Sequence, residues 1–120
     1  MSNTHDELIE MCKSIRETLL KFTDDSLVYD AEEDCFKPND GNTEDAGLRG
    51  YFDDCDIRLI TDLGGRLLGS RICVGYGGPN LYIDTYKEII EGFWGGDRIE
   101  IGIPFNICKM IDDEVEEMRY

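Results

Sequence analysis

A glycine-rich segment is the first part of this sequence to test for chemistry. Residues 75–102 read GYGGPNLYIDTYKEIIEGFWGGDRIEIG and contain two pairs of adjacent glycines. A phosphate site built on glycines needs backbone amides that converge at a helix N-terminus, as in GxxxxGK(S/T) or GxGxxG. Neither pattern occurs, and the GYGG run is followed by Pro79, which has no amide hydrogen to donate. We therefore interpret these glycines as corners of β-hairpins.

Nucleophilic catalysis also has few candidate residues. His5 is the only histidine and lies near the start of the chain, so a Ser-His or Cys-His pair is disfavoured. The five cysteines form no CxxC pair, which argues against a zinc finger or a disulfide framework. Cys12, Cys73 and Cys108 fall on apolar faces. Cys35 and Cys55 lie among acids, which disfavour a reactive thiolate. We predict no catalytic residue, no enzyme activity and no cofactor.

Carboxylates are numerous enough to test for a calcium site. Asp40, Asn42 and Glu44 occupy positions one, three and five of an EF-hand-like loop. Position six then holds aspartate instead of glycine, and position twelve holds tyrosine instead of the bidentate glutamate. The motif fails at both diagnostic places, so we predict no metal site, with weak cation binding at residues 53–56 as the alternative.

The acidic charge is unevenly distributed along the chain. The formal net charge is −15. Residues 24–62 hold thirteen acids against three bases, residues 63–111 are balanced, and residues 112–120 hold five acids and one base. The twelve basic residues are scattered singly, so no basic stripe is available to neutralise phosphates. We therefore expect no direct nucleic-acid binding and a partner that is a basic protein.

Apolar periodicity predicts a helix at each end of the chain. Residues 4–22 place an apolar side chain every third or fourth position, and Thr4 with Glu7 matches a capping box. Pro104 suits the first turn of a second helix, whose apolar stripe is Ile107, Cys108, Ile111, Val115 and Met118. The acids of the opposite face oppose the helix dipole, so they lower local stability and indicate selection for another purpose.

The centre of the chain alternates as a sheet does. Five runs of alternating residues lie within 57–61, 68–76, 81–84, 89–94 and 99–103, joined by short turns. Strands joined by such short turns run antiparallel. We predict a single α+β domain over residues 1–120: an antiparallel meander of about five strands with the two helices on one face. Residues 26–30 are expected to form a further short strand, and residues 31–54 an acidic loop pinned at its far end by Leu48, Tyr51 and Phe52.

Small size, strong acidity and acids held on a helix face resemble anti-CRISPR and antirestriction proteins of phages and mobile elements. The resemblance implies an inhibitor that occupies the basic channel of a nuclease, restriction enzyme or polymerase as a DNA mimic. No apolar run approaches the roughly 18 residues of a membrane span and the start resembles no signal peptide, so we expect a cytoplasmic protein with no membrane partner.

The partner-facing residues are predicted from the two acidic regions and the single tryptophan: Asp53, Asp54, Asp56, Asp112, Asp113, Glu116, Glu117 and Trp94. Two other interpretations stay open at this point. The chain could be an immunity protein or antitoxin for a basic toxin, or an acidic interaction domain whose charge serves solubility. A pocket lined by Tyr76, Tyr82 and Trp94 beside a carboxylate would instead favour an enzyme.

Overall fold

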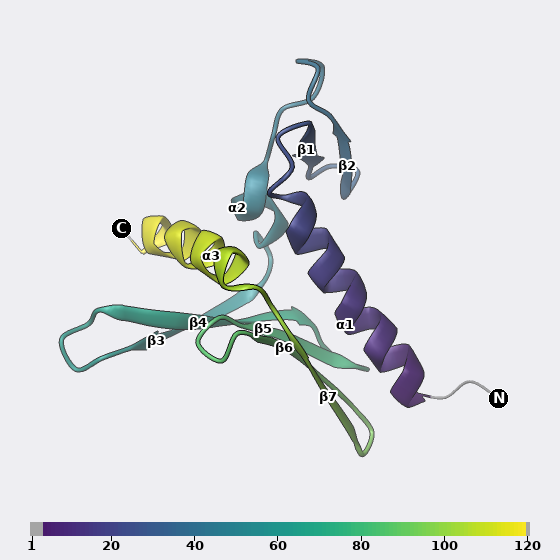
Figure 1. Cartoon of the computed structure of the whole chain (residues 1–120), viewed down its shortest axis with the longest axis vertical. Helices are drawn as coiled ribbons and strands as arrows, with labels where there is room; N and C mark the ends of the chain where they lie inside the picture. Colours follow the sequence, from purple (N-terminus) through teal and green to yellow (C-terminus); the bar gives the residue numbers. More distant parts are fainter. Residues whose placement is uncertain (1–3, 120) are drawn as a thin grey trace.

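The computed structural model describes residues 4–119 and shows an α+β architecture (Figure 1). The two long helices, α1 (Thr4–Lys21) and α3 (Phe105–Met118), lie toward the two ends of the chain. Between them lie a short hairpin, a short helix and five further strands: β1 (Leu27–Asp30), β2 (Cys35–Pro38), α2 (Gly47–Tyr51), β3 (Asp56–Thr61), β4 (Leu67–Gly75), β5 (Asn80–Asp84), β6 (Ile89–Trp94) and β7 (Asp97–Gly102).

Strands β3 to β7 form the predicted antiparallel meander, in the order β3-β4-β5-β6-β7. The glycine-rich segment supplies its turns. Gly77 and Gly95 both have positive φ, at 88° and 61°, and they lie in the β4–β5 and β6–β7 connections. This conformation is one that glycine adopts without a steric penalty. The interpretation as hairpin corners is therefore confirmed for the glycines of these two turns, whereas Gly75, Gly92 and Gly102 lie within strands.

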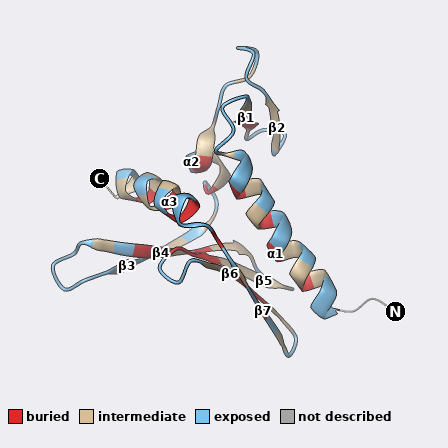
Figure 2. Cartoon of the chain, in the orientation of Figure 1, coloured by how far each residue is buried: buried red, intermediate tan, exposed pale blue. Residues whose placement is uncertain are grey.

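Both long helices pack on the same face of this sheet, as the sequence predicts. Ile72, Ile83 and Ile90 face one another across β4, β5 and β6, and all three are fully buried. They form one core with the apolar stripes of α1 and α3, whose members include Leu8, Cys12, Ile107, Ile111 and Val115. Figure 2 shows the buried residues of both helices on the sides that face the sheet.

Helix α1 approaches the sheet closely at Gly92 in β6. A Cβ atom at this position would lie 2.7 Å from Leu8 Cδ1 and 3.0 Å from Cys12 Sγ. The start of the helix is tied to the neighbouring hairpin, because the Thr4 hydroxyl donates a hydrogen bond of 3.2 Å to Asp97 of β7. The residue that we expected to cap α1 therefore joins the helix to the sheet.

A charged network lies on the face of the sheet opposite the helices. Glu91 of β6 is 2% exposed there, because two arginines cover it. Arg71 Nη1 donates to Glu91 Oε1 at 2.5 Å, and Arg98 Nη2 donates to Glu91 Oε2 at 2.7 Å. The Arg71 guanidinium also lies 4.2 Å from the ring centroid of Tyr82. Burial alone would raise the pKa of Glu91, but hydrogen bonds from Arg71 and Arg98 hold it below its usual range.

Residues 24–55 form an acidic lobe beyond the C-terminal end of α1 (Figure 1). Strands β1 and β2 pair within it, and Phe22, Tyr29, Phe36 and Tyr51 pack ring against ring at centroid distances of 4.9 to 5.7 Å. Residues 27–30 form the predicted strand. Leu48 and Phe52 are buried in the core, so the prediction that they hold the far end of this segment is confirmed. The expected loop over residues 31–54, however, contains strand β2 and helix α2.

Gly92→Val should destabilise the protein by about 1 to 3 kcal/mol, because the added side chain overpacks the contact with Leu8 and Cys12. The measurement is the free energy of unfolding by urea denaturation. Gly102→Val is the matched control, since a Cβ atom at Gly102 meets nothing within 4 Å. Equal stability of the two variants would contradict the close packing of α1 on β6.

Glu91→Gln should lower the free energy of unfolding at neutral pH by about 1.5 to 3 kcal/mol, since two charge-assisted hydrogen bonds are weakened. A carboxyl whose pKa is lowered on folding stabilises the native state above its unfolded pKa, and this contribution is lost as the pH falls through the folded pKa. Urea denaturation between pH 3 and pH 7 should therefore show a smaller acid-induced loss in the variant. An unchanged acid profile would count against the network.

Candidate interaction surface

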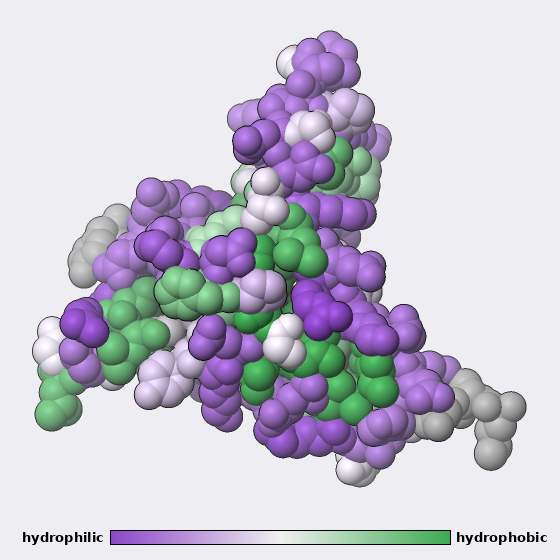
Figure 3. Space-filling model, in the orientation of Figure 1, coloured by the Kyte–Doolittle hydropathy of each residue, from purple (hydrophilic) through white to green (hydrophobic). Residues whose placement is uncertain are grey.

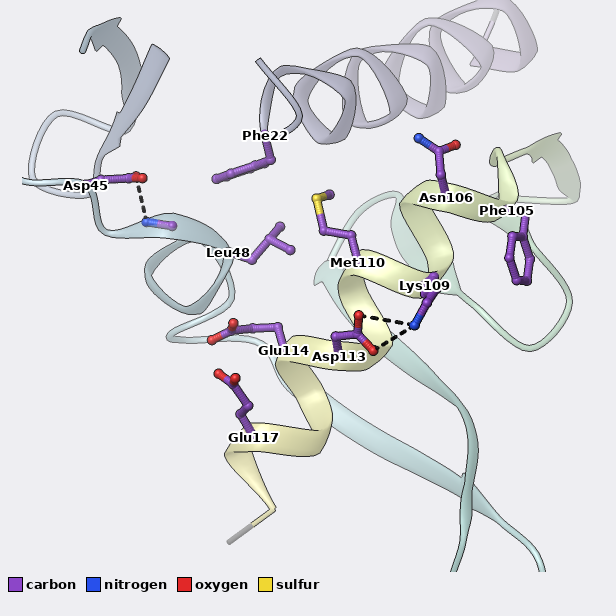
Figure 4. A pocket seen from close by; sticks show the side chains of 11 residues that line it. Phe22, Asp45, Leu48, Phe105, Asn106, Lys109, Met110, Asp113, Glu114 and Glu117 are labelled. Carbon is purple, nitrogen blue, oxygen red and sulfur yellow. Dashed lines mark hydrogen bonds and ion pairs between the residues drawn. The ribbon is translucent and has the colours of Figure 1, made fainter. Parts of the chain in front are cut away.

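A groove lies between the end of α1, helix α2 and helix α3 (Figure 4). We name it the α2–α3 groove. Its volume is about 550 Å³, and its lining residues are Phe22, Asp45, Gly47, Leu48, Phe105, Asn106, Lys109, Met110, Asp113, Glu114 and Glu117. It brings together lining residues of the acidic lobe and of α3 that are more than fifty positions apart in the sequence.

The groove has an apolar floor and an acidic rim. Figure 4 shows Phe22, Leu48 and Met110 projecting into the space between the helices. Leu48 is buried, and Phe22 and Met110 are partly buried and pack against the core. The charged lining side chains are four acids, three of which are exposed, and one lysine: Asp45, Asp113, Glu114, Glu117 and Lys109.

Ion pairs connect α2 to α3 at this rim. Arg49 Nε lies 3.0 Å from Glu114 Oε1, and Arg49 Nη2 lies 3.9 Å from Glu117 Oε2. One turn earlier on α3, Lys109 Nζ lies 3.4 Å from Asp113 Oδ1. The side chains of Asp113 and Glu117 remain 68% and 74% exposed, so both keep acceptor oxygens available to a further cation.

Asp112 belongs to the helix–sheet contact and not to this rim. The Thr85 hydroxyl donates a hydrogen bond of 2.7 Å to Asp112 Oδ1, and the Ser70 hydroxyl lies 3.5 Å from the same atom. Thr85 and Ser70 are themselves buried. Burial raises the pKa of the Asp112 carboxyl above its usual value, although the hydrogen bonds from Thr85 and Ser70 oppose that rise. Asp112 therefore anchors α3 to strand β4 and to the turn after β5.

Asp53 and Asp54 lie at the junction between the acidic lobe and β3. Both are exposed and line a second hollow, together with Tyr51 and Tyr76. Within residues 4–119, neither carboxylate takes part in an ion pair. They are therefore open to an external cation.

Two other acids of the predicted set are paired in sequence-local contacts. Asp56 Oδ2 lies 3.0 Å from Arg58 Nε at the edge of the sheet, and Glu116 Oε2 lies 3.2 Å from Arg119 Nη1. Of the predicted acids, the structure gathers Asp113 and Glu117 in the groove and Asp53 and Asp54 at the end of the lobe that adjoins β3. The remaining acids lie elsewhere.

Trp94 is separated from all of these acids. It is partly buried, packs against the core on the helix-covered face, and pairs in register with Asp97 at the β6–β7 turn. Asp97 contacts Thr4 at the start of α1, whereas the acidic lobe follows the end of that helix. The 18 residues of α1 span about 27 Å, so Trp94 and the lobe lie at opposite ends of it.

The aromatic pocket that would have favoured an enzyme does not form from the residues considered. Tyr76 and Tyr82 line different hollows. Tyr82 lies opposite Glu91 on the outer face, while Trp94 shares the inner face with Gly92. Burial raises the pKa of the Cys108 thiol to about 11 and also raises that of Cys12, as expected for cysteines that act as small buried hydrophobic residues.

Within residues 4–119, no group of three or more His, Cys, Asp or Glu side chains is arranged to hold a metal ion. None of the helices in this part of the chain is both long enough and apolar enough to cross a membrane. Comparison with protein-family models, with curated proteins and with solved structures gives no match.

Sequence reasoning missed Asp45, Glu114 and Met110 as members of the groove. Met110 lies beside the predicted stripe of α3 and not on it, and Asp45 lies in the segment expected to be a loop. The sequence held one indication of the groove. Met110 is an apolar residue beside an otherwise complete apolar stripe, which indicates a second contact surface on the same helix.

Asp112→Asn should stabilise the protein at neutral pH, because it removes a partly buried charge and keeps an oxygen that accepts from Thr85. A carboxyl whose pKa is higher in the folded state than in the unfolded state destabilises the native state when it is ionised. This destabilisation grows as the pH rises through the raised pKa. Urea denaturation from pH 4 to pH 8 should show a larger gain at pH 8 than at pH 4. Asp112→Ala, which loses the acceptor, should be less stable than the Asn variant by about 1 kcal/mol. An Asn variant whose gain does not change with pH would contradict this account.

Proposed function

We propose that this protein is a small acidic inhibitor that binds the basic nucleic-acid-binding surface of a nuclease or a related enzyme, as a DNA mimic. The observation that carries the proposal is the acidic lobe. Its residues 24–55 hold eleven acids and two bases, a net charge of −9. Figure 3 shows the surface of this projecting part as mostly hydrophilic.

The lobe holds its carboxylates on a folded support. The aromatic cluster of Phe22, Tyr29, Phe36 and Tyr51 fixes the β1–β2 hairpin, and Phe52 inserts into the main core. Acids on a folded support do not have to be ordered when a partner binds, so less conformational entropy is lost on association. This supports a binding role more than a solubilising one.

The excess negative charge and the size of the protein also fit a DNA mimic. Duplex DNA carries one charge per roughly 1.7 Å of its axis, so nine excess charges correspond to on the order of 15 Å of duplex. The longest dimensions of the protein are 44 and 43 Å, and its radius of gyration is 15.0 Å. The acidic lobe and the rim of the α2–α3 groove can therefore present DNA-like charge over part of one side of the molecule.

Charge reversal of Asp53, Asp54 and Glu117 should strongly weaken inhibition of a susceptible DNA-cleaving enzyme. The variant Asp53→Lys, Asp54→Lys, Glu117→Lys changes exposed positions, so we expect it to fold normally and to lose on the order of 100-fold in potency. The assay is DNA cleavage by a panel of CRISPR nucleases and restriction enzymes. The matched control reverses Asp6, Glu7 and Glu10, which lie in the first half of α1, toward the end of the helix that is remote from the lobe.

Two outcomes would contradict the proposal. In the first, inhibition of a susceptible enzyme is equally strong for the wild type and both triple variants. In the second, the affinity for that enzyme is the same at 50 mM and 500 mM salt, since electrostatic mimicry weakens as ions screen the exposed charges.

A further inference from the structure

The α2–α3 groove combines two kinds of recognition chemistry. Its floor of Phe22, Leu48 and Met110 offers apolar surface, and methionine adapts its shape to different apolar partners. Its rim carries Asp45, Asp113, Glu114 and Glu117. A ligand that satisfies both must present an apolar side chain flanked by positive charges.

The openness of the rim favours a segment of a protein over a small molecule. Small-molecule sites bury most of the ligand surface. Here the side chains of Asp113 and Glu117 are 68% and 74% exposed, so the walls do not close over an occupant. Phe105, which is 70% exposed at the edge of the groove, extends the apolar surface outward along α3.

Arg49 shows that the rim accepts a guanidinium. Its Nε lies 3.0 Å from Glu114, and its Nη2 lies 3.9 Å from Glu117. The Arg49 side chain is itself 57% exposed, so it is not locked in a buried ion pair. An arginine of a partner can therefore take the same carboxylates or the neighbouring Asp113, in competition with Arg49.

We propose that the α2–α3 groove binds a basic segment of the partner protein, with one apolar side chain between Phe22, Leu48 and Met110 and flanking arginines or lysines on the acidic rim. The inference rests on the proposed function, because it identifies the part of the inhibitor that recognises its basic target. It adds an apolar anchor that charge mimicry alone does not require.

Two synthetic peptides test the proposal on the full-length protein. Each peptide has a central residue with two arginines before it and two arginines after it. The central residue is leucine in the first peptide and glycine in the second. The dissociation constants, measured by isothermal titration calorimetry, should favour the leucine peptide by about tenfold, as burial of one leucine side chain predicts.

Variants of the groove separate the two contributions. Met110→Ser should remove most of the preference for leucine, whereas Met118→Ser, at the end of the same helix and outside the groove, should keep it. Glu117→Gln should weaken both peptides several-fold, and Glu116→Gln, one residue away but outside the groove, should not. Arg49→Gln should strengthen both peptides, because it removes the internal competitor. Circular dichroism and urea denaturation verify that each variant is folded.

Equal affinity for the two peptides, or equal effects of Glu116→Gln and Glu117→Gln, would overturn the proposal, since binding would then be diffuse electrostatic attraction. Tight binding of a neutral peptide that carries only the central leucine would also overturn it. These outcomes are independent of the inhibition assay, which contains no peptide. If the peptides do not bind as expected, inhibition through Asp53 and Asp54 can still be observed. If the leucine peptide binds but no nuclease is inhibited, the groove binds a basic partner of another class.

Discussion

The structure depends on one constraint: the five-stranded sheet has two faces, and within residues 4–119 the long helices cover one of them. The covered face is apolar and carries the core, with Gly92 permitting the close approach of α1. The other face is protected by its own side chains. Glu91, held between Arg71 and Arg98, is the buried centre of a charge network on that face, and Tyr82 and Phe93 lie beneath the two guanidinium groups.

This arrangement decides where the acidic charge can act. Four of the basic residues lie at or beside the outer face, namely Arg58, Arg71, Lys87 and Arg98, and each pairs with an acid of the sheet. These four positive charges are therefore neutralised by acids of the sheet itself. The unbalanced carboxylates lie in the acidic lobe and on α3, and both meet at the groove where Arg49 joins α2 to α3. The basic partner that we propose would therefore meet most unbalanced negative charge at this end of the molecule.

Helix α3 combines two roles that its sequence does not distinguish. Asp112 and Asp113 are adjacent acids, yet Asp112 accepts a hydrogen bond from Thr85 against the sheet while Asp113 stays exposed at the groove. Successive residues of a helix point about 100° apart, so neighbouring acids meet different environments. The acids near the end of α3 oppose the helix dipole, and the anchor at Asp112 together with the buried stripe holds the helix in place against that cost.

The sequence by itself determined the elements whose patterns are regular: the apolar stripes of both long helices, the alternation of the five-stranded meander, the glycine turns and the segregation of charge. These features are local, because a period of two or of about 3.6 residues states which side of an element is apolar. It did not reveal strand β2 or helix α2, which are short and are held by the aromatic cluster of Phe22, Tyr29, Phe36 and Tyr51. Only the tertiary structure decided that Glu91 is buried, that Asp112 is an anchor, that Trp94 lies apart from the acids, and that Asp45 and Glu117 share one groove. Each of these depends on what a side chain faces from a distant part of the chain, and periodicity carries no information about that.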